Sequence, residues 1–223
     1  MPTIVFLVDI DNTLLDNDRV KAAMEAGIRN LAGEGGAREF WAAYEEVRQE
    51  LDYVDLPLTL ARFRARRPDL RMFPQMSALL LNYPFESDLY PHAMEVVAHL
   101  REMGTVVVLS DGDPVFQPAK IGRIGVADAV DSNVLIYAHK ERHLHEVRDL
   151  YPADHYVLID DKAGVLARAK LVLGDQLTTV HVHQGKYATH DEGQEVPRSD
   201  IELDGIAEVL ALRRSQFLGH AGG

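Results

Sequence analysis

Three short apolar runs in this sequence each lead into acidic residues, and this repeated pattern limits the possible folds more than any other feature. The runs occupy residues 4–8, 106–109 and 156–159. They are followed, in order, by Asp9 and Asp11, by Ser110 and Asp111, and by Asp160 and Asp161. Continuous apolar runs are typical of strands in a parallel sheet that is covered on both faces. Because the carboxyl ends of such strands meet at one edge, we expect these polar side chains to share one cleft.

From residue 91 onward, segments with helical spacing alternate with strand-like runs. Helices are expected at residues 91–103, 115–124, 140–150, 164–173 and 206–214, and strands at 105–109, 134–137, 155–159 and 178–182. Strand and helix alternation with short connections predicts an α/β fold built on a parallel sheet.

Residues 18–81 have a different pattern, with no convincing strand. Apolar residues recur there at helical intervals in four stripes, which begin at Val20, Phe40, Leu56 and Met76. We interpret this stretch as an all-α module inserted after the first strand.

Several residues of this module have two interpretations. The arginines either offer a positive lip to a substrate anion or form a solvated helix face, which is the commoner case. They are Arg62, Arg64, Arg66, Arg67 and Arg71. Likewise, Trp41 and Tyr44 either line a pocket or belong to the core of the module.

Composition excludes several classes of function. The chain has 223 residues, a net charge of −12 and no cysteine. The negative balance opposes binding to nucleic acids, and the lack of cysteine excludes disulfides, thiolate zinc sites and a cysteine nucleophile. The first apolar run is too short for a membrane span and does not resemble a signal peptide. We therefore expect no targeting segment, no membrane contact and a cytoplasmic location.

The shared cleft would hold four carboxylates, from Asp9, Asp11, Asp160 and Asp161. Like charges this close raise one another's pKa unless a cation lies among them. Ligands that are all oxygen favour a hard divalent ion, above all Mg²⁺. One of the first two aspartates could act as a nucleophile while the other acts as an acid. A pair that only caps a turn is an equally good interpretation of these two residues alone.

The candidate anion-binding residues also have simpler interpretations. Ser110 could face an anion at a helix start, but a helix-capping serine is commoner. Lys140 follows a predicted strand, so its ammonium could offset the carboxylates and stabilise a transferred oxyanion. Lys120 competes for this role, but its mid-helix position suggests a solvated face. Lys162 is most simply a surface or helix-start residue.

Histidines offer a weaker signal. His181 and His183 lie on one face of the last predicted strand, like half of a zinc site. We expect no matched third ligand nearby, so polar residues of an edge strand are the better interpretation. The other candidates are His190 in a loop and, near one helix start, His139, His143 and His145.

Together these residues resemble the motifs of the haloacid dehalogenase (HAD) superfamily. The four motifs correspond, in order, to residues 9–15, Ser110, Lys140 and Asp160 with Asp161. Segments 89–93, 100–104 and 117–126 are also similar to the family. The resemblance implies a three-layer, Rossmann-like core at residues 1–15 and 88–218 and a helical cap at residues 16–87.

The resemblance also implies a role for each residue. Asp9 would be the nucleophile that forms an aspartyl-phosphate, and Asp11 the general acid/base. Ser110 and Asp111 would lie at the phosphoryl group, and Lys140 would hold the nucleophile and the phosphate. Asp161 would bind Mg²⁺ directly with help from Asp160, alongside the Asp9 carboxylate and the Asp11 backbone carbonyl. Family members that cleave carbon–halogen bonds lack the second acid, Asp11, and need no metal.

Two positions differ from the family's pattern. Val165 stands where relatives often have a further acidic residue, and Asp111 where they often have asparagine. The expected function is a Mg²⁺-dependent phosphatase, a monomer or homodimer, that acts on a small phosphorylated metabolite. The alternatives are a phosphomutase that acts on a sugar phosphate and a catalytically idle binding protein with the same fold.

Overall fold

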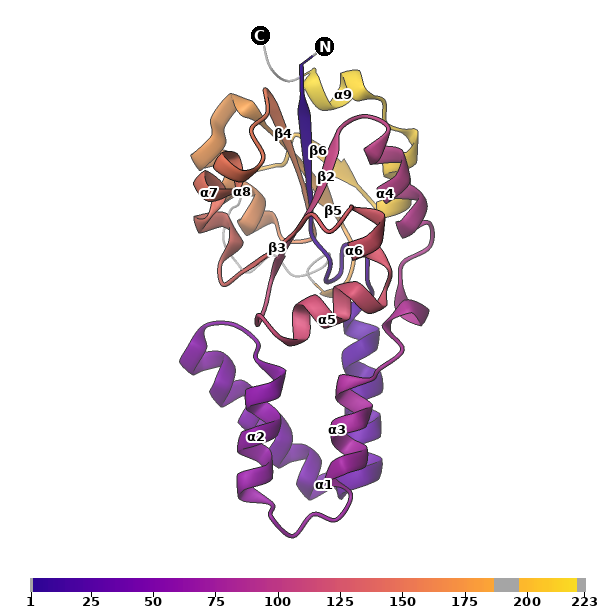
Figure 1. Ribbon diagram of the computed structural model, residues 1–223, viewed down its shortest axis with the longest axis vertical. Coiled ribbons are helices and arrows are strands. Elements are labelled where there is room, and N and C mark those ends of the chain that lie inside the picture. Colours follow the sequence, from indigo (N-terminus) through magenta and orange to yellow (C-terminus); the bar gives the residue numbers. More distant parts are fainter. Residues whose placement is uncertain (1, 187–196, 220–223) are drawn as a thin grey trace.

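The computed structural model describes residues 2–186 and 197–219, which form a six-stranded parallel sheet flanked by helices (Figure 1). The strands follow the order β3-β2-β1-β4-β5-β6. Their bounds are β1 Ile4–Val8, β2 Thr105–Asp111, β3 Val134–Tyr137, β4 His155–Asp160, β5 Leu177–Val182 and β6 Ile201–Leu203. The predicted α/β fold with a parallel sheet is confirmed. The sequence pattern missed β6, which has only three residues.

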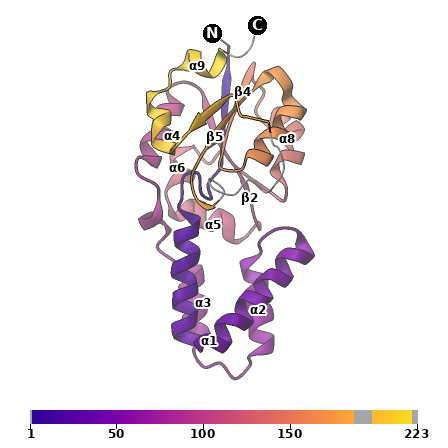
Figure 2. The ribbon, with the colours of Figure 1, turned by 180° about the vertical axis from the view of Figure 1, so that it is seen from behind.

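The sheet separates two apolar layers, so the core has three layers. In β1, Ile4, Phe6 and Val8 pack into one cluster, whereas Val5 and Leu7 pack into the other. Neighbouring side chains of a strand point to opposite faces, and every residue of β1 is buried because both faces are covered. Helices α4 (Ala93–Arg101) and α9 (Arg214–Leu218) cover one face, and α7 (Leu144–Leu150) and α8 (Ala163–Leu173) cover the other (Figures 1 and 2).

Of the helices between β1 and β2 in the sequence, the first three lie at one end of the sheet (Figure 2). They are α1 (Asn17–Leu51), α2 (Leu56–Arg66) and α3 (Phe73–Leu81). The first two expected stripes fall on the single run α1, whose helical geometry is interrupted at Gly33 with φ 70° and ψ 174°. Glycine adopts this conformation at little cost. The assignment of residues 16–87 to a separate cap domain stays a prediction.

The two chain segments that lead into and out of these helices run side by side. The Asp16 backbone N–H donates to the Asp88 carbonyl at 2.8 Å, and the Tyr90 N–H donates to the Leu14 carbonyl at 2.9 Å. These contacts hold both connections close to the carboxyl end of β1. The start of α1 is thereby fixed near the predicted site.

The remaining helices follow the expected order with local differences. Helix α5 spans Phe116–Arg123, a short α6 spans Val126–Ala129, and 3-10 turns occupy Phe85–Asp88, Lys140–Arg142 and Gly174–Gln176. The helix expected at 206–214 is instead a 3-10 segment, Ile206–Ala211, followed by α9. Leu212 has extended backbone, and Arg213 N–H donates to Gln216 Oε1 at 2.9 Å, so a new helix begins there. Within residues 2–186 and 197–219, no helix has the length and apolar character needed to cross a membrane.

Candidate active site

The loop after β1 presents Asp9 and Asp11 at the carboxyl edge of the sheet. The Asp9 N–H continues the pairing with β4 by donating to the Ile159 carbonyl at 3.0 Å. Asn12 then has a positive φ of 62°, a conformation that asparagine tolerates better than most residues. Three successive N–H groups donate to the Ile10 carbonyl, those of residues 13, 14 and 15. This tight turn fixes the two carboxylates relative to the sheet.

Lys140 lies between two of the predicted carboxylates. Its Nζ is 2.5 Å from Asp9 Oδ1 and 2.7 Å from Asp160 Oδ2, and it also donates to the Leu109 carbonyl at 3.1 Å. The lysine side chain has no exposed surface. The structure therefore brings together three residues that are separated by as many as 151 positions in the sequence. Parallel strands produce this convergence because β1 lies between β2 and β4.

Asp161 completes a cluster of three buried carboxylates. Ligand oxygens of Asp9, Asp160 and Asp161 all lie within 4.8 Å of one another. Both carboxylate oxygens of Asp161 are buried and have no hydrogen-bond partner. An unpaired buried carboxylate is costly. The cluster therefore has the donor set and the unsatisfied charge expected of a site for a hard cation.

The electrostatics of the cluster follow from burial and from neighbouring charge. Burial raises the pKa of Asp161 to about 9, and the Asp160 and Asp9 carboxylates add to this effect. Burial also raises the pKa of Asp9 to about 6, although Lys140 opposes the rise. Burial lowers the pKa of Lys140, but the carboxylates of Asp160 and Asp9 raise it by more, so the ammonium stays charged. Lys140 is therefore a fixed cation of the site, yet the pKa of Asp161 stays raised, so the carboxylates lack sufficient positive charge.

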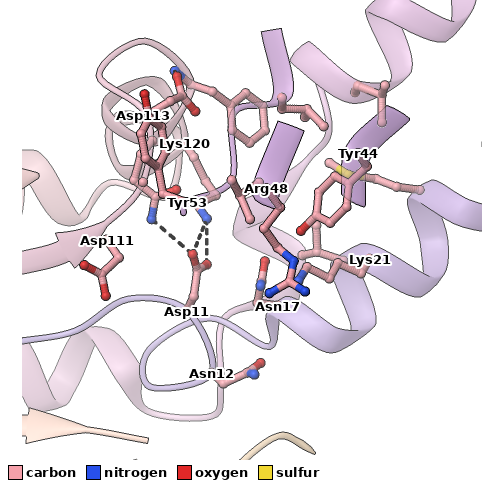
Figure 3. Close-up of a pocket in the computed structure, with 18 of the residues that line it drawn as sticks. Asp11, Asn12, Asn17, Lys21, Tyr44, Arg48, Tyr53, Asp111, Asp113 and Lys120 are labelled. Carbon is pink, nitrogen blue, oxygen red and sulfur yellow. Dashed lines mark hydrogen bonds and ion pairs between the residues drawn. The ribbon is translucent and has the colours of Figure 1, made fainter. Parts of the chain in front are cut away.

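Asp11 has a different partner, which the sequence interpretation missed. Lys120 Nζ lies 2.6 Å from Asp11 Oδ1 and 2.8 Å from Oδ2, and Gln117 Nε2 donates to Oδ2 at 3.1 Å (Figure 3). Partial burial raises the pKa of Asp11, but Lys120 lowers it by more, which leaves it below its usual value. The expectation of a solvated face for Lys120 is wrong, since the side chain is 4% exposed. Helix α5 crosses the carboxyl edge of the sheet, so its buried face meets the site.

The two predicted anion-binding residues are held by internal hydrogen bonds. Ser110 is buried, and its Oγ accepts from Gln117 Nε2 at 2.9 Å. Asp111 Oδ1 accepts from the Lys140 backbone N–H at 2.8 Å. This bond positions the loop that carries Lys140, but asparagine could accept it as well, so it does not explain the acid at this position. Gly112 follows with φ 156°, and a Cβ there would lie 3.0 Å from the Gln117 side chain.

Lys162 and Val165 complete the account of the fourth motif. Lys162 begins α8, as expected of a helix-start residue, and its backbone N–H donates to Asp160 Oδ1 at 2.8 Å. Burial lowers the pKa of Lys162, but the Asp9 and Asp160 carboxylates raise it by more. The residue is therefore part of the charged site as well as a helix start. Val165 packs in the apolar layer beneath α8, so it adds no acid to the site.

A cleft of about 530 Å³ opens beside Asp11, between the carboxyl edge of the sheet and the helical segment. Residues from both parts line it, and Figure 3 shows Lys21, Tyr44 and Arg48 of α1 on the wall away from Asp111. The apolar part of the lining comprises Val20, Met24, Phe40, Trp41, Val54, Leu56, Leu80, Phe85 and Phe116. Of the predicted site residues, Asp11 and Asp111 line the cleft. Trp41 and Tyr44 both line the cleft and pack on the core of the helices.

These features agree with comparisons to known proteins. Residues 5–163 match the family model for haloacid dehalogenase-like hydrolases. A structure from Burkholderia xenovorans, described as a haloacid dehalogenase-like hydrolase, is 42% identical with a TM-score of 0.88, over 96% of this chain and 100% of that chain. The chain belongs to the haloacid dehalogenase-like hydrolases. The predicted resemblance is thereby confirmed. No curated protein matched the sequence.

More distant structures share the fold of this HAD-like hydrolase. An L-2-haloacid dehalogenase from Xanthobacter autotrophicus is 17% identical with a TM-score of 0.61, over 95% of this chain and 98% of that chain. A magnesium-bound HAD hydrolase from Bacillus subtilis is 14% identical with a TM-score of 0.62, over 95% of this chain and 100% of that chain. A protein described as a dehalogenase and one described as a magnesium-bound hydrolase therefore share this architecture.

Most of the remaining charged candidates of this HAD-like hydrolase lie away from the cleft. Arg62, Arg66 and Arg67 form exposed ion pairs with Glu50, Glu46 and Glu39, and none of the five arginines lines the cleft. The solvated helix face is therefore the right interpretation. His143 pairs with Glu146 at 2.9 Å, and His139, which does line the cleft, pairs with Asp52 at 2.8 Å. His190 lies outside the described residues.

The histidine pair of β5 corrects two expectations. Strand β5 is not an edge strand, because β6 pairs with it. A third potential ligand is also present, since Glu202 of β6 contacts both His181 and His183. The sequence pattern did not indicate Glu202 as a ligand, because this residue belongs to β6, the strand that the pattern missed.

Proposed function

We propose that this HAD-like hydrolase is a Mg²⁺-dependent phosphatase that acts on a small phosphomonoester. The observation that carries the proposal is the carboxylate of Asp161, buried beside Asp9 and Asp160 with neither oxygen hydrogen-bonded. Such an arrangement suits an enzyme that uses a divalent cation. It does not suit a reaction that needs no metal, because the unpaired charge would then only destabilise the fold.

Asp9, Asp160 and Asp161 would hold the Mg²⁺, and the ion would supply positive charge to the phosphoryl oxygens. The resemblance adds the backbone carbonyl of Asp11 to this set. The carboxylate of Asp11 is already engaged by Lys120 and Gln117. Phosphoryl transfer depends mainly on alignment and on neutralisation of charge. The ammonium groups of Lys140 and Lys162 contribute to alignment and to the neutralisation of charge.

The chemistry would proceed in two steps at Asp9. A carboxylate oxygen of Asp9 attacks phosphorus, the bond from phosphorus to the ester oxygen breaks, and Asp11 gives its proton to the leaving oxygen. Asp11 then takes a proton from water, whose oxygen attacks phosphorus. The bond from phosphorus to the Asp9 oxygen breaks, which releases inorganic phosphate and restores the Asp9 carboxylate. Lys120 favours the ionised form of Asp11, the form that accepts the proton in the second step. Lys120 is therefore a positioning residue in this proposal.

The cleft also supports a small anionic substrate. Its volume of about 530 Å³ suits a metabolite, and Lys21, Arg48 and Lys186 lie among its lining residues. In a chain whose net charge is −12, these three cations with Lys120 and Lys162 equal in number the five carboxylates of the lining. This balance favours a small phosphorylated metabolite over a nucleic acid.

Phosphate release from an aryl phosphate tests the proposal. We expect activity with Mg²⁺, loss of activity with EDTA, and a decrease of at least about a hundredfold in Asp9→Asn and Asp11→Asn. Asp175→Asn removes an exposed carboxylate and should leave the rate unchanged. Full activity in either site variant would refute the assignment. Chloride release from a 2-chlorocarboxylic acid without phosphate release would indicate a dehalogenase instead, and conversion of one sugar phosphate into another would indicate a mutase.

A further inference from the structure

The side chains of His181, His183 and Glu202 form a second compact group of metal-binding atoms at the β5–β6 pair. Glu202 Oε2 lies 3.1 Å from His181 Nδ1 and 2.6 Å from His183 Nε2. One ligand atom from each residue lies within 4.8 Å of the others. The group is separate from the three aspartates and has no role in the proposed phosphatase chemistry.

The hydrogen bonds around His181 indicate that a cation belongs at its Nδ1. Its Nε2 lies 3.1 Å from the backbone carbonyl of Asp161, which can only accept. A neutral imidazole that donates from Nε2 presents a lone pair at Nδ1, and this lone pair faces the carboxylate of Glu202. Two acceptors then face each other unless a metal ion lies between them or the ring takes a second proton and donates from Nδ1 to Glu202. Metal-binding histidines characteristically donate their second ring nitrogen to a carbonyl or carboxylate, as His181 does here.

Glu202 is oriented for the same purpose. Its Oε1 accepts from the Ser199 backbone N–H at 2.9 Å, which leaves Oε2 directed at the two imidazoles. The strand register sets His181 directly opposite Glu202, so the backbone fixes the spacing of these two residues. The side chains of Glu202 and His183 are 26% and 36% exposed, so an ion and a water molecule can reach them. One carboxylate oxygen and two ring nitrogens are thus presented toward a single point.

We propose that His181, His183 and Glu202 bind Zn²⁺. Two imidazoles and one carboxylate with an open fourth position are a common zinc set, whereas Mg²⁺ prefers oxygen ligands alone. With bonds of about 2.0–2.1 Å, the edges of a tetrahedral site are about 3.3–3.4 Å long. The 3.1 Å contact of Glu202 with His181 lies near this length. The 2.6 Å contact with His183 would have to lengthen by about 0.7 Å, which the partly exposed side chains of His183 and Glu202 allow. Because His181 donates to the Asp161 carbonyl, zinc binding would also fix the backbone beside the aspartate cluster.

Zinc binding to the full chain, stripped of metal with a chelator, tests this site directly. A chromophoric zinc chelator in competition with the protein reports affinity and stoichiometry. The measurement is made in Asp161→Asn, so that the aspartate cluster does not compete for zinc. We expect one bound Zn²⁺ in this background, and at least about tenfold weaker binding after adding His183→Gln or Glu202→Gln. Adding His143→Gln, which alters a histidine outside the group, should change nothing.

Two further measurements keep the result decisive. X-ray absorption at the zinc edge should show two imidazole nitrogens in Asp161→Asn and one in its combination with His183→Gln. Thermal melts without metal should show that Glu202→Gln is folded, since its side-chain oxygen can still accept from Ser199 N–H. Zinc that binds the wild type but not Asp161→Asn would assign the ion to the aspartate cluster and overturn the proposal. Equal affinity in Asp161→Asn with and without either added substitution would overturn it as well.

Discussion

Asp9 and Asp11 lie two positions apart, yet each is paired with a different lysine. Lys140 contacts Asp9 within the buried cluster, whereas Lys120 contacts Asp11 at the margin of the cleft. The two pKa values shift in opposite directions, because burial prevails at Asp9, whereas Lys120, Gln117 and Lys162 together outweigh burial at Asp11. Both shifts oppose the first proposed step, which needs an ionised Asp9 and a protonated Asp11, so a cation bound at Asp9 and a phosphate beside Asp11 would have to reverse them.

We expect the Lys120–Asp11 pair to be strongly coupled in stability. Lys120→Met would leave the Asp11 carboxylate partly buried without its cation and should lower the free energy of unfolding by about 3 kcal/mol. In the double variant with Asp11→Asn, the combined loss should be smaller than the sum of the single losses by at least about 1 kcal/mol. Urea unfolding of the four proteins in the cycle measures this coupling.

An exposed ion pair provides the matched control for this cycle. Arg101 and Asp131 are both exposed, and their Nη2 and Oδ2 atoms lie 2.5 Å apart. The same cycle with Arg101→Met and Asp131→Asn should give coupling close to zero, because solvent screens such pairs. Additive losses at Lys120 and Asp11 would mean that the contact contributes no more than a surface ion pair.

The sequence predicted the residues of the cluster better than those around it. Asp9, Asp160 and Asp161 lie at the carboxyl ends of β1 and β4, and Lys140 follows β3 by three residues, so strand order brings them to one edge. Lys120 lies in the middle of a helix, and only the direction in which α5 crosses the sheet decides whether it meets solvent or Asp11. Helical spacing does not contain that information. For the same reason, helical spacing does not show which arginines line the cleft, as Arg48 does, and which ones face solvent.

Among the elements, the β5–β6 pair depends on one aspartate. Asp200 Oδ2 accepts from Lys170 Nζ at 2.8 Å, from Thr179 N–H at 2.8 Å and from Thr179 Oγ1 at 3.0 Å. These contacts join the end of α8, the middle of β5 and the residue before β6. A three-residue strand has few backbone hydrogen bonds of its own. A side chain that accepts three hydrogen bonds can therefore contribute much of the strand's stability.

Asp200→Asn should therefore have an effect that depends on pH. Partial burial raises the pKa of Asp200, but the hydrogen bonds from Lys170 and Thr179 lower it by more. The native carboxyl thus binds a proton less readily than the unfolded one. Its stabilisation is fully present above the unfolded pKa of about 3.9 and is lost as pH falls through the native pKa.

We expect Asp200→Asn to lower the free energy of unfolding by about 1–3 kcal/mol at pH 7. The difference from wild type should shrink progressively below about pH 4. Denaturant titrations at a series of pH values measure both quantities, with the exposed Asp175→Asn as the reference. A difference that stays constant down to pH 2.5 would show that the hydrogen-bond geometry matters and the charge does not.

The elements differ in how well their sequences indicate them. β1 is apolar throughout and β4 is apolar from Tyr156 to Ile159, both strands are buried, and the sequence pattern found them within a residue of their bounds. β6 consists of Ile201, Glu202 and Leu203, too few residues to show a periodicity. Its pairing with β5 is supported by Asp200, a tertiary contact that spacing does not reveal. Short edge elements and their side chains, such as Glu202, are therefore where sequence interpretation is weakest.

In the molecule as a whole, the aspartate cluster is the main place where local energetics oppose the fold. Asp161 is buried with two unpaired oxygens, and its pKa is raised to about 9. A raised carboxyl pKa means that ionisation favours the unfolded chain. The cluster is therefore costly to the fold in the absence of a cation, whereas Lys140 keeps Asp9 and Asp160 paired. We infer that the cation has a structural effect in addition to any catalytic one.

Thermal melts with and without Mg²⁺ test this coupling of metal and fold. A ligand present at about 100 times its Kd stabilises the native state by about 2.7 kcal/mol, which for a chain of this length should raise the wild-type Tm by about 5 to 10 °C. Asp161→Asn should melt above the wild type without metal, because it removes the unpaired carboxylate, with a gain on the order of a few kcal/mol. It should gain nothing further from Mg²⁺, whereas Asp175→Asn should respond as the wild type does. An unchanged Mg²⁺ response in Asp161→Asn would place the ion elsewhere.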